Sequence, residues 1–250
     1  MRIASYNLWN ADEGMPIRAQ QLVTEIQTVQ ADILCLQEVA DRAHFEFILK
    51  ALDFPYACFR NHKNEREGLA ILSRYPITRP KYTSHAVIVS ITLEDKKITL
   101  SNIHLDWNSA LNREKDIIGI VKNIAALKAD YSFIAGDFNC SPHSSVHQFL
   151  LGQQSLFHRE AKPYWIDLAE SFGCTKGIPP EVTVDFRNNP RWQKENSVEV
   201  SQRFDRILMM NPYPRDFPRL LLFDTFGKSV DSHTGLAPSD HWGVFADLLL

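Results

Sequence analysis

Side chains that can carry acid–base and metal chemistry recur where short apolar runs of this sequence begin or end. The set is Asn7, Glu38, His104, Asp137, Asn139, Asp205, Asp240 and His241. A single Asp or Asn beside a strand is commonly a turn former or a helix cap. Six separate run ends that offer only Asn, Asp, Glu and His instead predict one shared polar site, because strand ends fix the backbone while their loops leave space for a ligand.

The residue types favour a hard, oxygen-binding cation, Mg²⁺ or Mn²⁺, because the carboxylates occur without thiol partners. We expect Glu38 and Asp240 to be its protein ligands. Mg²⁺ typically uses one or two protein carboxylates and keeps positions for water and a phosphate oxygen. The sequence therefore predicts metal-assisted chemistry on a phosphate.

The remaining polar residues suit roles around such a cation. An aspartate beside a histidine fixes the imidazole tautomer and supports its positive charge, so Asp205 and His241 are expected to pair. The amides of Asn7 or Asn139 can orient a water or a phosphate oxygen without adding negative charge. The sequence contains no serine nucleophile elbow, no Gly-rich phosphate loop and no HExxH helix, which argues against those other mechanisms.

The elements that must position these groups are short strands alternating with helices. Strand-length apolar runs lie at residues 2–6, 33–36, 69–72, 86–93, 98–103, 131–135, 206–210 and 242–249. Helical spacing predicts helices over residues 17–29, 43–52, 112–127, 145–151 and 166–172. The runs 86–93 and 98–103 flank four charged residues and predict an antiparallel hairpin. Hairpins mixed with helical crossovers predict an α/β fold of mixed sheets covered by helices.

Length and composition are those of an ordinary globular protein. The 250 residues, 44% hydrophobic and 23% charged, suit a single catalytic domain over residues 1–250. No stretch of 18 apolar residues is present to span a bilayer, so we expect no membrane association. Four cysteines without paired spacing favour a reducing cytoplasm. The lack of a repeated apolar face favours a monomer.

The formal net charge of −3 indicates that any contact with nucleic acid must be local. The basic run 60–66 is one candidate lip, and a solvated loop is the alternative. The long polar segment 175–202 is another candidate, because loops of this length inside a domain are often functional. In it, Trp192, Arg187 and Arg191 either stack on and pair with nucleic acid or pack within the loop itself.

Seven short motifs, taken in order, resemble the endonuclease/exonuclease/phosphatase superfamily. They are SYNLW, DILCLQEV, GLAILSRYPI, SNIHLD, IAGDFN, RFDRI and SDHWGV, and they span residues 5–244, nearly the whole chain. The resemblance implies a four-layer α/β sandwich in which two packed mixed β-sheets are flanked by helices. It also implies a hydrolase whose site lies at one edge of the sheets, between the strand-end loops.

Within that superfamily the sequence is most similar to the 5′-tyrosyl-DNA phosphodiesterases, through RFDRI and SDHWG. This resemblance implies a nucleic-acid substrate, such as a protein-linked DNA end met in DNA repair, bound by Arg113, Asp185, Arg206 and Trp242. The chain departs from that group in having Val184 where the group has a tryptophan, and HLDW where it has HLES. The alternatives are a general DNA or RNA nuclease and, less favoured, a lipid or sugar phosphate phosphodiesterase, a branch in which SDHxP stands where this chain has SDHWG.

The hydrolysis predicted here uses a water as the nucleophile. Asp137, oriented by Asn139, positions or deprotonates that water, and His104 donates to the phosphate as negative charge builds. His241, held by Asp205, either lies near a non-bridging oxygen or acts as the base. The sequence leaves the proton acceptor open between Asp137 and His241.

Overall fold

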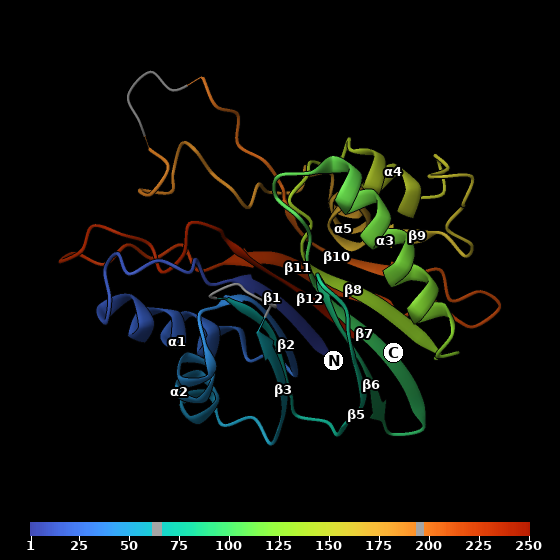
Figure 1. Cartoon of the computed structure of the whole chain (residues 1–250), viewed down its shortest axis with the longest axis horizontal. Coiled ribbons are helices and arrows are strands. Elements are labelled where there is room, and N and C mark those ends of the chain that lie inside the picture. Colours follow the sequence, from blue (N-terminus) through green and yellow to red (C-terminus); the bar gives the residue numbers. More distant parts are fainter. Residues whose placement is uncertain (62–66, 194–197) are drawn as a thin grey trace.

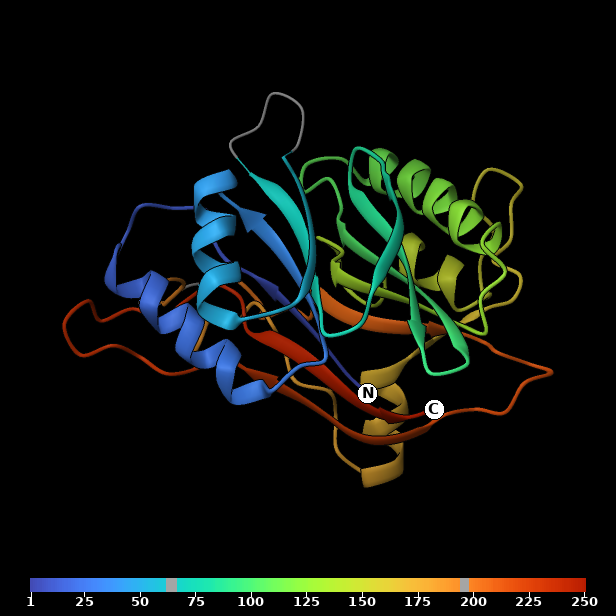
Figure 2. The ribbon, with the colours of Figure 1, turned by 90° about the horizontal axis from the view of Figure 1, so that it is seen from below.

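Two six-stranded sheets lie face to face, and helices cover their outer faces (Figures 1 and 2). This computed structural model describes residues 1–61, 67–193 and 198–250. The first sheet has the strand order β11-β12-β1-β2-β4-β3, and the second has the order β5-β6-β7-β8-β10-β9. The arrangement confirms the predicted four-layer α/β sandwich.

The bounds of the elements are as follows. The strands are β1 (Arg2–Asn7), β2 (Ile33–Val39), β3 (Tyr56–Asn61), β4 (Gly68–Ser73), β5 (Ile77–Tyr82), β6 (Ala86–Leu93), β7 (Lys96–His104), β8 (Tyr131–Asp137), β9 (Trp165–Asp167), β10 (Asp205–Met210), β11 (Arg219–Phe226) and β12 (Gly243–Leu249). The helices are α1 (Ile17–Val29), α2 (Arg42–Leu52), α3 (Ala110–Ala125), α4 (Ser145–Leu150) and α5 (Leu168–Lys176). Of the helices in the described ranges, none combines the length and the apolar character needed to cross a membrane.

Alternate residues of the strands fill the space between the two sheets. Ile33 and Cys35 of β2 belong to this inter-sheet core, together with Leu100 and Phe133 of the second sheet. The residues between them on β2, such as Leu34, face α1 and α2 in a separate core cluster. Side chains of a strand alternate between its two faces, so a strand covered on both sides needs a continuous apolar run. This explains the run at residues 33–36.

Helices α1 and α2 bury apolar residues on the outer face of the first sheet, and α3 and α4 on that of the second. Helix α5 instead packs against β10 and β11, one strand of each sheet. Helix α3 buries Ile117, Ile120 and Ile124, which recur at the three- and four-residue spacing of one helix face. It begins after Ser109, whose hydroxyl oxygen accepts a hydrogen bond from the Asn112 N–H at 3.2 Å. The chain between β7 and α3 is therefore short and held at both ends.

The four strands that the sequence analysis missed, β3, β5, β9 and β11, are the edge strands of the two sheets. No residue of β3 or β5 is fully buried, and β9 has only 3 residues, so these strands give little apolar signal. Pro80 is tolerated in β5 because an edge strand needs fewer ladder N–H groups. Strand β11 does contain an apolar run, Leu220–Phe223, which the sequence analysis did not assign to a strand. The helix predicted over 166–172 begins instead at Leu168, because Asp167 ends β9 and caps α5 by accepting from Ala169 N and Glu170 N. Residues 62–66 of the basic run 60–66, and 194–197 of the segment 175–202, lie outside the described residues.

Candidate active site

Three neighbouring strands of the second sheet, β7, β8 and β10, present polar side chains side by side at one end of the sheet. His104, at the end of β7, lies opposite Asp137 in the parallel pairing with β8, and Asp137 lies opposite Asp205 in the antiparallel pairing with β10. Gly136 permits this approach, because a Cβ at that position would lie 2.0 Å from the Ile103 carbonyl oxygen. The register alone thus aligns a histidine and two carboxylates.

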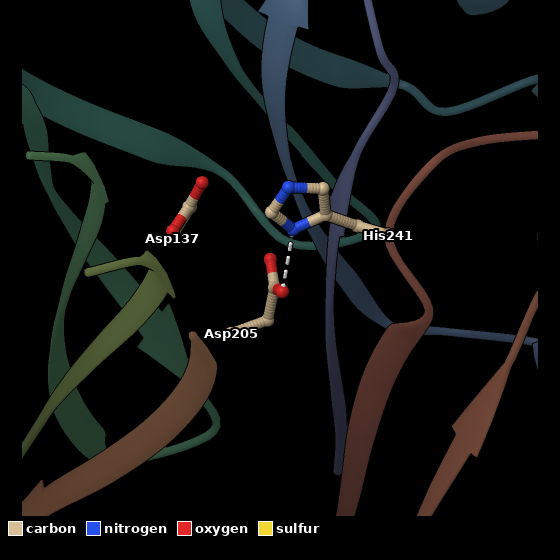
Figure 3. A group of neighbouring side chains, drawn as sticks. All are labelled: Asp137, Asp205 and His241. Carbon is tan, nitrogen blue, oxygen red and sulfur yellow. Dashed lines mark hydrogen bonds and ion pairs between the residues drawn. The ribbon is translucent and has the colours of Figure 1, made fainter. Parts of the chain in front are cut away.

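Asp205 and His241 form the predicted pair. Asp205 Oδ2 lies 2.8 Å from His241 Nδ1, and both side chains are buried (Figure 3). Burial opposes the charged imidazole, but the Asp205 and Asp137 carboxylates raise the pKa of His241 well above its usual value. Burial raises the pKa of Asp205, and the neighbouring imidazolium opposes that rise. The pair therefore leaves His241 Nε2 as an N–H donor.

The amide of Asn7 joins carboxylates from both sheets. Asn7 Nδ2 donates to Glu38 Oε1 at 2.9 Å and to Asp137 Oδ2 at 3.2 Å. The backbone N–H of Asn10 donates to the other Glu38 oxygen at 2.8 Å. Glu38 lies where the β2–β4 pairing is interrupted, with a φ of 55°, and this irregularity turns its side chain toward the site. Glu38 and Asp137 consequently lie within reach of one amide nitrogen.

His104 lies between three carboxylates. Its Nε2 is 3.7 Å from Glu38 Oε1 and 3.6 Å from Asp137 Oδ2, while its Nδ1 is 3.5 Å from Glu67 Oε1. Sequence reasoning missed Glu67, although this residue directly precedes the GLAILSRYPI motif and could have been found from it. Carboxylates from three segments therefore surround the imidazole, and Nε2 is the ring nitrogen that faces Glu38 and Asp137.

Asn139 holds the turn that follows Asp137. Its backbone N–H donates to Asp137 Oδ1 at 2.7 Å, and its Nδ2 donates to the Leu105 carbonyl oxygen at 2.8 Å. Its φ of 48° is one of the left-handed values that asparagine tolerates. The residue thereby orients the Asp137 carboxylate and ties it to the loop after β7.

Asp240 belongs to a loop that Ser239 ties to β1. The Ser239 hydroxyl donates to the Asn7 carbonyl oxygen at 2.6 Å and accepts from the His241 N–H at 3.1 Å. Burial raises the pKa of Asp240 to about 6, and the nearby Glu38 carboxylate adds to the effect. The His241 imidazolium opposes this rise, and the Asp137 and Asp205 carboxylates add to it.

Arg18, which the sequence analysis did not select, ties two of the loops at the site together. Its fully buried guanidinium donates to the backbone carbonyl oxygens of Leu8, Trp9, Ala11, Glu13 and Pro238. A fork of five N–H groups suits this role, whereas a lysine has three donors at one atom. The loop after β1 is thus held against the segment that leads to Asp240.

The donor set fits a hard divalent cation. Glu38, Asp137, Asp205 and Asp240 bring four carboxylates together, and within the part of the chain that the structure describes none of them forms an ion pair with Lys or Arg. Asp137, Asp205 and His241 each offer a donor atom within 4.8 Å of the others. Within this group Asp205 is already bonded to His241, and the half-buried Glu38 carboxylate is a further oxygen donor beside Asp137.

The four residues that the resemblance assigned to substrate binding lie in different settings. The Arg113 Nη1 group donates to the Asp106 and Trp107 carbonyl oxygens, so its described contacts are with the loop after β7. Asp185 accepts from the backbone of its own loop, from Arg187 N and Asn188 N. These two residues shape loops beside the site.

Trp242 and Arg206 are buried. Trp242 borders a cavity of about 360 Å³ with Asp185, Asn188 and Lys228, directly after His241. Arg206 is fully buried on the other face of β10 from Asp205, with its guanidinium 4.3 Å from the Phe138 ring centre and bonded to the Cys140 carbonyl oxygen. Strand alternation explains why Arg206 points toward the helix-covered face and away from the carboxylates.

The segment 175–202 contributes packing beside the site. Trp192 Nε1 donates to the Asp240 carbonyl oxygen at 2.6 Å, and its ring packs against Phe186. The Arg191 guanidinium lies near the rings of both Trp9 and Trp192. These contacts agree with the alternative in which Trp192 and Arg191 pack within the loop, and they hold the backbone of Asp240 in place.

Comparison with known proteins gives one family and several similar folds. A family model described as the Endonuclease/Exonuclease/phosphatase family matches residues 4–241. Truncated TDP2 from Caenorhabditis elegans superposes with a TM-score of 0.76 at 21% identity, covering 100% of this chain and 97% of that one. D. rerio TDP2 complexed with a single-strand DNA product gives 0.76 at 18% identity, covering 100% and 99%. An endonuclease/exonuclease/phosphatase from Bacteroides vulgatus gives 0.75 at 15%, covering 100% and 98%.

At these identities the solved structures establish likeness of fold alone. A comparison with curated protein sequences finds no match.

Proposed function

Because the chain belongs to the endonuclease/exonuclease/phosphatase family, and is thus a metal-dependent phosphodiesterase or nuclease, we propose that it hydrolyses a nucleic-acid phosphodiester with Mg²⁺ and an activated water. The observation that supports this most is the Asn7 amide, which bonds to Glu38 of one sheet and Asp137 of the other. A cation at Glu38 and a water at Asp137 would then be neighbours, as a metal-assisted hydrolysis needs.

In this proposal Glu38 holds the cation, with Asp240 as the second carboxylate. When bound there, Mg²⁺ would supply positive charge that stabilises the phosphate under attack and its leaving group. The residues present fit the ion, since both are oxygen donors and neither forms an ion pair with Lys or Arg within the described ranges. A bound cation would also reduce the repulsion between the carboxylates gathered at the site.

Asp137 is the group that orients the attacking water and accepts its proton. One carboxylate oxygen accepts from Asn139 N and the other from Asn7 Nδ2, which fixes the plane of the carboxylate. Each oxygen keeps a lone pair for one further donor, the water. Fixed in this way, the carboxylate needs no reorganisation during the reaction.

His241 and His104 stabilise the phosphate as its negative charge grows. His241 is bonded through Nδ1 to Asp205, which favours the imidazolium and leaves Nε2 to donate to a non-bridging oxygen. His104 Nε2 faces Glu38 and Asp137 and is positioned to donate to a second oxygen. This assigns the proton acceptor to Asp137 and donor roles to both histidines.

For the substrate, we propose a 5′-phosphotyrosyl end of DNA, as met in DNA repair, with a general DNA or RNA nuclease as the alternative. The C. elegans and D. rerio TDP2 folds cover this chain completely, and one of them is complexed with a single-strand DNA product. We further propose a monomer in the cytoplasm, where the free thiols of the four cysteines would be maintained.

A substrate panel tests the proposal. Purified protein is given a 5′-phosphotyrosyl oligonucleotide, the same oligonucleotide without tyrosine, an abasic duplex, RNA and sphingomyelin, each with Mg²⁺ and with EDTA. We expect Mg²⁺-dependent release of tyrosine that exceeds cleavage of the plain strand. Equal turnover of plain DNA would favour the general nuclease, and turnover of sphingomyelin alone, or undiminished turnover in EDTA, would contradict the proposal.

A further inference from the structure

Trp107 is the one tryptophan of the five that solvent reaches freely. Its relative exposure is 78%, and it lies three residues after His104. The other four are buried or half-buried: Trp9, Trp165, Trp192 and Trp242. A large apolar ring left in water beside a reaction site has most of its contact surface available to a ligand.

The loop that carries Trp107 is held rigidly from inside. Asp106 Oδ1 accepts from the N–H groups of Asn108 and Ser109 at 2.8 and 2.9 Å, and its Oδ2 accepts from Asn112 Nδ2 at 2.7 Å. Arg113 Nη1 donates to the carbonyl oxygens of Asp106 and Trp107 at 2.7 and 3.2 Å. The backbone of Trp107 is therefore fixed while its ring remains exposed, so a stacked partner costs little ordering of the protein.

This loop starts at the reaction centre. Leu105 donates its N–H to the Asp137 carbonyl oxygen at 3.0 Å and accepts from Asn139 Nδ2 at 2.8 Å. Three residues span at most about 11 Å of chain, so the Cα of Trp107 lies within that distance of the Cα of His104. Figure 1 shows the loop as the green segment between β7 and α3, at the end of the second sheet where β8 also ends. A strand whose phosphate met His104 would therefore come within reach of this loop.

We propose that Trp107 is a stacking platform for an unpaired base next to the scissile phosphate, so that the enzyme selects single-stranded nucleic acid. The inference rests on the proposed function of the site. An aromatic face accepts any base, but only a base released from its duplex neighbours exposes a face to it. A single exposed ring suits one base, and a protein interface would need a larger patch.

Steady-state cleavage of a short single-stranded oligonucleotide in Mg²⁺ provides the test. Stacking on an aromatic side chain has the strength to change binding about 5- to 100-fold. We expect Trp107→Ala and Trp107→Leu to raise KM by that factor, Trp107→Phe to restore most of it, and kcat on saturating substrate to change little. Tyr213→Ala is the matched control, because this ring is equally exposed, at 78%, but follows the end of β10 opposite to Asp205.

Oligonucleotides with one abasic position identify the base. Where the missing base is the stacked one, the KM of wild type should rise as much as it does for Trp107→Ala on the intact oligonucleotide. Trp107→Ala acting on that abasic oligonucleotide should then show no further rise in KM. Binding in EDTA gives an independent reading: the single strand should quench the tryptophan emission of wild type but leave that of Trp107→Phe much less changed.

The outcomes separate the two proposals. If wild type cleaves the oligonucleotide and Trp107→Ala matches it in KM and in preference over duplex, stacking is refuted while the proposed function stands. If wild type cleaves no nucleic acid in Mg²⁺, both are overturned. Stacking would also be refuted if the rise in KM from Trp107→Ala added to the rise from each abasic position, wherever that position lies.

Discussion

At the scale of single residues, the site is dominated by its excess of carboxylates. Glu38, Asp137, Asp205 and Asp240 face two histidines, and the pKa of Asp240 rises to about 6 because it is buried among like charges. Such an arrangement lowers the stability of the fold, and clusters of this kind are typical of binding and catalytic sites. Each carboxylate nevertheless has its own hydrogen-bond partners, and these predict distinct roles.

Asp137→Asn should lower the cleavage rate by about 10²- to 10⁴-fold, because the amide cannot accept the proton of the attacking water. The fold should persist, since asparagine has nearly the same shape and can keep a bond to Asn139 N. Initial rates on the preferred oligonucleotide, with circular dichroism as the check on folding, measure this. Asp95→Asn, at a side chain 88% exposed, is the matched control. A rate within threefold of wild type would remove Asp137 from the mechanism.

Glu38→Gln should raise the Mg²⁺ concentration needed for half-maximal activity by at least tenfold, because a neutral amide binds a hard cation less strongly than a carboxylate. The contacts with Asn7 and Asn10 are retained in part by the amide oxygen. A Mg²⁺ titration of activity, with Glu46→Gln on the exposed face of α2 as the control, gives the answer. An unchanged Mg²⁺ requirement would exclude Glu38 as the ligand.

At the scale of elements, a second polar cluster joins α4, β9 and α5 beneath the second sheet. His147 of α4 is 2% exposed, with Nε2 3.6 Å from Asp167 Oδ2, and the same oxygen accepts from Arg203 Nη1 at 2.7 Å. Burial lowers the pKa of His147 to about 4, and the Arg206 cation adds to the effect. The histidine is therefore neutral in the native protein at neutral pH.

This histidine predicts a loss of stability in acid. The pKa of this histidine is 6.5 in the unfolded chain and about 4 in the native protein. As the pH falls below 6.5, the unfolded chain therefore takes up a proton that the native protein does not, and the unfolded state is stabilised. The free energy of unfolding should fall by about 3 kcal/mol from this group between pH 7 and pH 4. Urea unfolding of wild type and His147→Leu over this range measures the difference.

His147→Leu should show a weaker decline with falling pH than wild type, because leucine cannot take up a proton. His233→Gln, at an exposed position, should decline in parallel with wild type. Parallel curves for wild type and His147→Leu would mean that this imidazole contributes nothing to the acid sensitivity.

At the scale of the whole molecule, a second asparagine besides Asn7 connects the two sheets. Asn102 of β7 donates through Nδ2 to the carbonyl oxygens of Leu36 and Ala70 in the first sheet, both at 2.8 Å, and accepts from Gln37 Nε2 at 2.7 Å. All of these contacts are buried. Gln37 is next to Glu38 in the chain, and Asn102 is two residues before His104. The bridge therefore sets how the two halves of the site face each other.

Asn102→Ala should lower the free energy of unfolding by about 3 kcal/mol, because it leaves buried carbonyl and amide groups without partners and opens a small cavity. Denaturant unfolding at neutral pH measures this loss. Asn123→Ala is the control, since that side chain accepts from Lys81 in an exposed bond. If both variants lose the same small amount, the bridge contributes little to holding the sheets together.

Much of this architecture follows from local sequence patterns. Strands buried on both faces are continuous apolar runs, and buried helices show apolar residues at three- and four-residue spacing, so the sequence predicted both. The polar residues at the run ends predicted a convergent site, where Asn7 bonds to Glu38 and Asp137, and His241 bonds to Asp205. These signals are local because each depends on which face a residue takes within its own element.

The tertiary structure alone decided what depends on register and on contacts between distant segments. Strand alternation turns Arg206 away from the carboxylates, which a motif match does not reveal. The Asn102 bridge, the bond from Arg18 to Pro238 and the Glu67 contact with His104 join residues 30 or more positions apart. The edge strands β3 and β5 contain no fully buried residue and carry little apolar signal. A single sequence holds no record of such pairings, because they arise only when the two sheets pack.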